Sequence, residues 1–166
     1  LIRKLSKNNY KIIAVTRNIH KAGYILKTQA NPGYLELVEL NNFQIDKIEE
    51  LMKRASICIN LIGILFEKKK NDFNLIHSDL PALLSKKANE FQLERFIHLS
   101  ALGIEKASES KYALSKLDGE KRIKENFNKH IILKPSIVYS VDDNFSTKFM
   151  ALLSSLPFMP LYYNGK

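Results

Sequence analysis

Short runs of apolar and β-branched residues alternate along the chain with longer segments in which apolar residues recur at helical spacing. The runs that predict strands are Lys11–Thr16, Tyr34–Leu40, Ser56–Leu61, Arg95–Ser100 and Ile131–Tyr139. The segments that predict helices are Phe43–Arg54, Asp72–Phe91, Tyr112–Asn126 and Asn144–Ser155. This alternation is typical of βαβ units, and it predicts a parallel sheet flanked by helices.

Two of the strand candidates are almost continuously apolar. They are Ile57–Ile62 and Phe96–Leu99. Strands that are covered on both faces have this character, so we expect both to lie in the centre of the sheet. Pro81 lacks a backbone donor and is expected to bend the helix that contains it.

Composition places the chain among ordinary globular domains. Its 166 residues are 45% hydrophobic, enough to bury a core. The net charge of +9 is spread along the chain, with one tight cluster at Lys68–Lys70. We interpret it as a solvated lysine-rich surface and do not expect nucleic-acid binding. The single cysteine, Cys58, excludes an intrachain disulfide and favours a reducing compartment. The chain has no run of 18 apolar residues, so no transmembrane segment is expected.

A serine, a tyrosine and a lysine carry the most informative chemistry. Ser100 ends an apolar strand candidate, and Tyr112 and Lys116 follow at the start of a helix. A hydroxyl at the carboxyl end of a strand lies where open α/β proteins bind ligands, and residues four apart share a helical face. An ammonium and an oxidised nicotinamide both favour the phenolate, which would make the tyrosine a usable acid or base. A Tyr-x-x-x-Lys pair alone is a weak signal; the order of strand, serine and helix strengthens it.

Three segments carry a resemblance to the short-chain dehydrogenase/reductase superfamily, in its extended or atypical branch. They are Phe96–Gly103, Tyr112–Glu120 and Ile132–Tyr139. Within that branch they are most similar to the group that contains the nucleotide-binding accessory subunit of respiratory complex I and its bacterial relatives. The resemblance implies an α/β fold with a Rossmann-like, doubly wound parallel sheet.

The resemblance also assigns roles to individual residues. Ser100, Tyr112 and Lys116 fall on the catalytic Ser, Tyr and Lys of the superfamily. Ser100 would polarise the substrate oxygen and Tyr112 would exchange the proton. Lys116 would hold the nicotinamide ribose and lower the pKa of the phenol.

Further positions fall on cofactor-binding motifs of the superfamily. One set falls on the turn beside the ribose and adenine: Asn60, Leu61, Ile62 and Gly63. A second set falls on the motif beside the nicotinamide amide: Pro135, Ser136 and Ile137. Lys134 precedes this motif in place of the usual Arg, so a planar two-pronged contact is lost there.

Residues after the first two strand candidates bear on the choice of dinucleotide. Arg17, which Asn18 follows, stands where an enzyme that prefers NAD would have an acidic residue, and an arginine favours the 2′-phosphate of NADP(H) over NAD(H). An alternative is that Arg17 only points into solvent. Glu39 and Leu40 resemble the acidic-apolar pair that the family places near the adenine.

The glycine-rich turn that binds pyrophosphate in the family is absent from the chain. None of the six glycines lies between a strand and a helix at the required spacing. We therefore expect a fragment of a longer protein, with the first strand and the glycine loop missing upstream. Residues 1–140 would be a partial NAD(P)-binding domain, and 141–166 the start of a C-terminal part that binds substrate or partner. A gap should then separate Lys11–Thr16 from Ser56–Leu61, unless the two strands collapse together.

Two functions remain open at this point. One is an NAD(P)H-binding protein similar to the complex I accessory subunit, in which the dinucleotide has a structural or redox role. The other is an active NAD(P)-dependent reductase, dehydrogenase or sugar-nucleotide epimerase. The first implies association with complex I or another inner-membrane assembly. It also implies a location in the cytoplasm or peripherally on the inner membrane, on the matrix side in a eukaryote. The four histidines are dispersed, and no metal site is expected.

Overall fold

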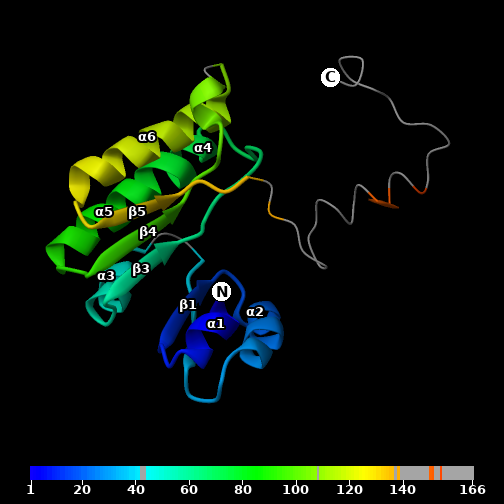
Figure 1. The fold of residues 1–166 in the computed structure, drawn as a ribbon, viewed down its shortest axis with the longest axis vertical. Helices are drawn as coiled ribbons and strands as arrows, with labels where there is room; N and C mark the ends of the chain where they lie inside the picture. The colour runs from blue at the N-terminus through cyan, green and yellow to red at the C-terminus, as the bar shows by residue number, and fades with distance from the viewer. Residues whose placement is uncertain (42–43, 108, 137, 139–149, 152–153, 155–166) are drawn as a thin grey trace.

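The computed structural model describes residues 1–41, 44–107, 109–136, 138, 150–151 and 154. Its strands are β1 (Ile12–Thr16), β2 (Leu35–Glu39), β3 (Ile57–Asn60), β4 (Arg95–Leu99) and β5 (His130–Leu133). Its α-helices are α1 (Ile2–Lys7), α2 (Ile19–Leu26), α3 (Ile45–Lys53), α4 (Asp72–Asn74), α5 (Leu80–Glu90) and α6 (Lys111–Asn126). Single turns of other helix types are η1 (Lys27–Gln29), η2 (Leu75–Asp79) and η3 (Ile104–Lys106). All five expected strands are present, and the expected α/β class is confirmed (Figure 1).

The strands form two separate parallel sheets. One contains β1 and β2, and the other has the order β3-β4-β5. The expected separation is therefore present, because Ile12–Thr16 and Ile57–Asn60 belong to different sheets. Each of these two strands has one edge without a strand partner within the described residues.

The expectation that both apolar strands are central is half wrong. β4 is the central strand of its sheet, but β3 lies at the edge. One face of this sheet also remains open, since Ile57, Ile131 and Leu133 are exposed. The described helices cover only the opposite face. A strand that is apolar on both faces is buried only where both faces are covered.

The core lies between that covered face and the helices α3, α5 and α6. Phe96 on β4 is fully buried and packs with Ile123 of α6 and Leu84 of α5. Ile48 and Met52 of α3 belong to the same cluster. Figure 1 shows α5 and α6 lying side by side over β4 and β5. This packing fixes α6, and with it the expected site, against the sheet.

The expected helix over Asp72–Phe91 is interrupted by one π-helical turn, η2, between α4 and α5. Pro81 lies in the first turn of α5, where its missing N–H is tolerated, so the expected bend takes the form of a change in helix type. The carbonyl of His77 in this turn approaches Gly119 of α6 so closely that an added Cβ would lie 1.9 Å from its oxygen. The absence of a side chain at Gly119 therefore permits the contact between the two helices.

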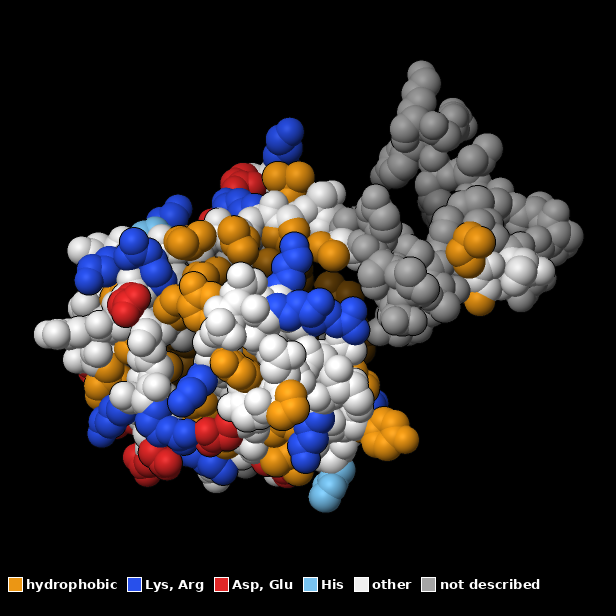
Figure 2. All heavy atoms as spheres, turned by 60° about the horizontal axis from the view of Figure 1, so that its bottom comes forward, with side chains coloured by type: hydrophobic (Ala, Val, Ile, Leu, Met, Phe, Trp, Pro, Cys, Tyr) orange, Lys and Arg blue, Asp and Glu red, His pale blue; other side chains and the backbone are white. Residues whose placement is uncertain are grey.

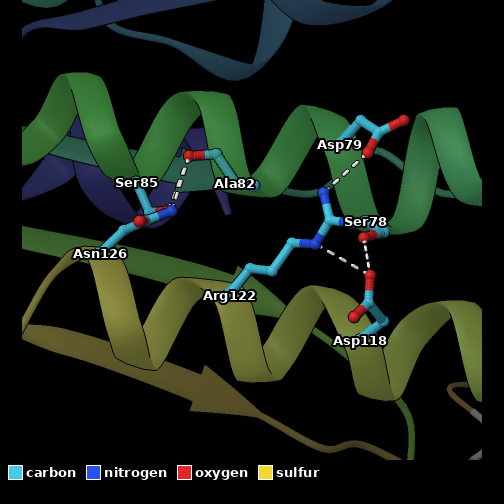
Figure 3. A network of polar contacts seen from close by, with 7 residues as sticks. All are labelled: Ser78, Asp79, Ala82, Ser85, Asp118, Arg122 and Asn126. Carbon is cyan, nitrogen blue, oxygen red and sulfur yellow. Dashed lines mark hydrogen bonds and ion pairs between the residues drawn. The ribbon is translucent and has the colours of Figure 1, made fainter.

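Polar side chains join α6 to η2 and α5 on the outer side of this contact. Arg122 pairs with Asp79 at 2.8 Å and with Asp118 at 2.9 Å, and Ser78 donates to Asp118 (Figure 3). Asn126 donates to the carbonyl oxygen of Ala82 and to Ser85 Oγ. These contacts set the position of α6 along α5.

Helix α2 was not expected from the sequence. Its first turn is capped by Asn18, whose Oδ1 accepts a hydrogen bond of 2.8 Å from the Lys21 amide. The segment is short and contains Gly23, which lowers helix propensity. Its helical conformation therefore depends on tertiary contacts with β2.

The last expected elements were longer than those observed or lie outside the described residues. β5 ends at Leu133 rather than Tyr139, because Pro135 has no N–H to continue the ladder. Most of the expected helix over Asn144–Ser155 falls outside the described residues, of which Met150, Ala151 and Ser154 are helical, and so does most of the expected C-terminal part.

Lysine and arginine side chains are distributed over the face shown in Figure 2 and do not gather into one patch. None of the described helices is long and apolar enough to cross a bilayer.

Candidate functional site

Two buried polar side chains lie side by side near the carboxyl ends of β3 and β4. Asn60 is opposite His98 in the parallel register. Asn60 Oδ1 accepts the Ile62 amide at 3.0 Å, so its Nδ2 is the donor to His98 Nδ1 at 3.2 Å. The proton of the neutral imidazole must then be on Nε2, which is buried without a hydrogen-bond partner among the described residues. Burial and the charge of Lys116 lower the pKa of His98 to about 4.

A second buried histidine connects the loop after β3 to helix α6. His77 Nε2 accepts the backbone N–H of Ile64 at 3.1 Å, and its Nδ1 lies 3.0 Å from Ser115 Oγ. Ser115 donates its own hydrogen to the carbonyl oxygen of Tyr112, so Nδ1 carries the proton. Burial lowers the pKa of His77 to about 4, and the ring is neutral at pH 7. Its ring also contacts the edge of Tyr112.

Tyr112 and Lys116 are adjacent on α6, as their spacing predicts. The Lys116 ammonium lies 5.6 Å from the centre of the Tyr112 ring and donates to the carbonyl oxygen of Leu99 at 3.3 Å. Burial lowers the pKa of Lys116, and burial raises the pKa of Tyr112. In this structure the ammonium approaches the ring, and the effect on the phenol is loss of solvent, so the lowering of the phenol pKa by Lys116 stays a prediction for the dinucleotide-bound protein.

Ser100 is buried and bonded to a carboxylate of α6. Its hydroxyl donates to Glu120 Oε1 at 2.5 Å, and both side chains are buried. The other oxygen of Glu120 pairs with Lys134 at 2.9 Å, and Lys134 also pairs with Glu105. The structure thus places Tyr112 and Lys116 against each other, while the Ser100 hydroxyl is bonded to Glu120, whose charge also acts on Lys116.

The loop that follows β3 lies next to the ammonium of Lys116. Leu61, Ile62 and Gly63 are exposed. A Cβ added to Gly63 would lie 3.9 Å from Lys116 Nζ and 3.8 Å from His77 Nε2. Gly63, which is expected to contact the cofactor, therefore lies beside Lys116, which is expected to bind its ribose.

The segment after β5 borders the same region. The carbonyl oxygen of Pro135 accepts the amide of Leu102, which links it to the loop after β4. Ser136 is exposed, and Ile137 lies outside the described residues.

The expected adenine-side residues gather at the carboxyl end of the other sheet. Glu39 Oε2 accepts the Ile19 amide at 2.9 Å, and Asn41 donates to its other oxygen at 3.0 Å. The hydrogen bond from Ile19 holds the pKa of Glu39 below its usual value. Arg17 directly follows β1 and is exposed, whereas Leu40 packs against the hydrophobic core.

Three polar residues of the site received no role from the sequence. His77, His98 and Glu120 are each at most 3% exposed and connect the candidate residues to one another. Glu120 lies within the Tyr112–Glu120 motif, and His98 interrupts an apolar run, which are the signals that point to them. No comparable pattern marks His77, because the π-helical turn that directs it inward has no simple sequence signature.

Comparison with known proteins gives relatives of one kind. No family model matches the chain. The mouse protein "NADH dehydrogenase [ubiquinone] 1 alpha subcomplex subunit 9, mitochondrial" is 32% identical over 124 residues, which are 75% of this chain and 33% of that protein. The protein of the same name from Dictyostelium discoideum is 26% identical over 165 residues, 98% of this chain and 45% of that protein. The chain is homologous to these complex I subunits. It spans between a third and a half of their length.

Solved structures support the fold. The chain matches the Bordetella bronchiseptica enzyme WbmH in complex with NAD+ with a TM-score of 0.68 at 12% identity, over 92% of this chain and 57% of that one. It matches the Citrobacter triphenylmethane reductase complexed with NADP(H) with a TM-score of 0.61 at 21% identity, over 87% of this chain and 46% of that one. Together with the homologues, these matches confirm the resemblance to the atypical dehydrogenase/reductase group and its Rossmann-like fold.

Proposed function

We propose that the chain forms part of a site for a nicotinamide dinucleotide, held for a structural or redox role. The observation that carries the proposal is the buried ammonium of Lys116 beside the exposed backbone of Gly63, at the carboxyl end of β3. Carboxyl ends of parallel strands are where open α/β sheets bind dinucleotides. Relatives named as complex I subunits and neighbours solved with NAD+ or NADP(H) support the same reading.

The donors present fit the ribose of such a ligand. An ammonium has three hydrogens to donate, and the carbonyl of Leu99 is the one hydrogen-bond acceptor of Lys116 among the described residues. Ribose hydroxyls can accept the others. When bound, the nicotinamide would supply hydride-transfer capacity. Lys116 would orient the nicotinamide ribose, and Leu61–Gly63 would line the adenine side of the dinucleotide.

Several features favour binding over turnover. The Ser100 hydroxyl donates its hydrogen bond to Glu120, so its hydrogen is not available to a substrate oxygen. Burial raises the pKa of Tyr112, which opposes formation of the phenolate that proton exchange requires. An active reductase, dehydrogenase or epimerase remains the second candidate, because Ser100, Tyr112 and Lys116 are all present.

We further propose a preference for NADP(H) over NAD(H). Arg17 is exposed at the end of β1, and Glu39 is occupied by the amide of Ile19 and the side chain of Asn41. A guanidinium at this position can pair with a 2′-phosphate. The Arg17→Ala substitution should weaken NADPH binding tenfold or more and leave NADH binding within about twofold.

The relatives' names also suggest where the protein acts. We propose that it associates with respiratory complex I or another inner-membrane assembly, in the cytoplasm or peripherally on the inner membrane. Recovery of the tagged protein with that assembly from its own cells tests this directly. Recovery as a free protein under mild detergent conditions would contradict it.

The central experiment is titration of the complete protein with NADPH and NADH, followed by nucleotide fluorescence. Lys116→Met keeps the length of the side chain and removes its donors, so affinity should fall tenfold or more. The matched control is Lys121→Met on the same helix, where the ammonium is largely exposed and affinity should not change. Unchanged affinity in Lys116→Met, or no binding of either nucleotide by the parent protein, would overturn the proposal.

Tyr112→Phe separates the two candidate functions. A binding protein should keep its affinity for the dinucleotide and its place in the assembly. An enzyme should keep its affinity and lose most of its turnover, because the phenol supplies the proton.

A further inference from the structure

We propose that the loop from Leu65 to Lys70, between β3 and α4, is a docking element for an anionic membrane surface. Leu65 and Phe66 would enter the interfacial layer, and Lys68–Lys70 would lie on the headgroups. This inference goes beyond dinucleotide binding and does not depend on it.

The tip of the loop exposes two large apolar side chains in succession. Leu65 is 82% exposed and Phe66 is 66% exposed. Single exposed apolar residues are common on protein surfaces, but an adjacent leucine and phenylalanine at a loop tip gain from leaving water.

The base of the loop is held by hydrogen bonds from backbone amides to side chains, so the tip is presented in a defined position. The Ile64 amide donates to the buried ring of His77 at 3.1 Å. The Phe73 amide donates to Glu67 Oε1 at 3.0 Å. The amides of Lys68 and Lys69 donate to Asp72 Oδ2 at 3.0 and 2.8 Å. A preorganised tip loses little conformational entropy when it inserts.

The charges of the loop fit an anionic surface. Lys68, Lys69 and Lys70 are all exposed, and they form the tightest basic cluster of the sequence. The two carboxylates nearby, Glu67 and Asp72, bind backbone amides at the base of the loop. A lysine close to an anionic membrane strengthens binding by about fivefold. A nucleic acid would account for the lysines but would leave Leu65 and Phe66 in water, which is why lipid is the better fit.

Vesicle binding by the complete protein tests the proposal. The probes are vesicles of phosphatidylcholine alone and vesicles that also contain phosphatidylglycerol, separated by flotation. We expect binding to the anionic vesicles and a loss of tenfold or more in the Leu65→Ser/Phe66→Ser variant and in the Lys68→Gln/Lys69→Gln/Lys70→Gln variant. The matched control is Tyr24→Ser/Ile25→Ser on α2, which removes another exposed apolar pair and should leave vesicle binding unchanged.

A fluorescent variant reports insertion directly. The chain has no tryptophan, so Phe66→Trp adds a probe whose emission can be followed as the difference from the parent protein. Its emission should shift to shorter wavelength with anionic vesicles, whereas Tyr24→Trp should not shift. Equal binding by the parent protein and the Leu65→Ser/Phe66→Ser variant would indicate attachment by charge alone and overturn the proposal. Absence of vesicle binding, or retention on DNA in place of vesicles, would overturn it as well.

Discussion

The Ser100 hydroxyl lies 2.5 Å from Glu120 Oε1, with both groups buried between the sheet and α6. Glu120 also pairs with Lys134, so the residue that the sequence suggests as a catalytic serine is part of an ionic network. A hydroxyl that donates a hydrogen bond to a buried carboxylate stabilises the fold and is not free to polarise a substrate oxygen.

This network predicts unequal effects on stability. Ser100→Ala should lower the free energy of unfolding by about 2 kcal/mol, the value of one hydrogen bond to a charged group. Glu120→Gln should cost about 3 kcal/mol, because it leaves the buried ammonium of Lys116 and the partner Lys134 without their carboxylate. Urea unfolding of the variants measures both. Glu125→Gln, at an exposed position of the same helix, should have little effect. Equal costs for Ser100→Ala and Glu120→Gln would contradict the network.

The contact of α6 with η2 predicts a severe effect of a single methyl group. In Gly119→Ala the new Cβ would meet the carbonyl oxygen of His77, so the helices must separate and the free energy of unfolding should fall by about 3 kcal/mol or more. Gly23→Ala on α2 is the control, because its new Cβ would find only ordinary contacts and should add about 0.5 to 1 kcal/mol. Thermal melts of the two variants should therefore move in opposite directions.

Two neutral buried histidines predict a loss of stability in mild acid. Burial lowers the pKa of His77 and His98 to about 4, so the unfolded chain binds protons at higher pH than the native state does. The stability that they contribute is complete above their ordinary pKa of 6.5 and is lost as the pH falls toward 4. From pH 7 to pH 5 the loss should be about 2 kcal/mol for each histidine. Urea unfolding at the two pH values tests this. In His98→Gln the loss of unfolding free energy between pH 7 and pH 5 should be smaller by the contribution of one histidine. A flat profile in the parent protein would refute it.

The hydrogen bond from Asn60 to His98 leads to a prediction about the protonation state of His98. Asn60→Asp keeps an acceptor for the Ile62 amide but replaces the donor to His98 Nδ1 with a carboxylate. A negative charge there favours the imidazolium, so the pKa of His98 should rise well above about 4. Titration of the His98 ring signals by NMR measures the shift. Asn126→Asp near the far end of α6 should leave those signals unchanged.

The apolar periodicity identified the five strands and the helices α3 and α6 because burial of one face imposes a regular spacing on the chain. It failed where the outcome depends on neighbours rather than on local pattern. Helix α2 is short and contains Gly23, and the turn η2 arises where α5 must approach α6 across Gly119. The edge position of β3 likewise depends on which strand pairs with it.

The sequence by itself determined the α/β class, the family resemblance and the adjacency of Tyr112 and Lys116, since spacing along one helix is a local property. Only the tertiary structure decided what these groups do to one another. Whether an ammonium reaches a phenol oxygen or a ring, and whether Ser100 faces a ligand or Glu120, depends on how α6 lies against β4. That placement follows from packing between residues far apart in the sequence, and burial then sets the pKa of each group.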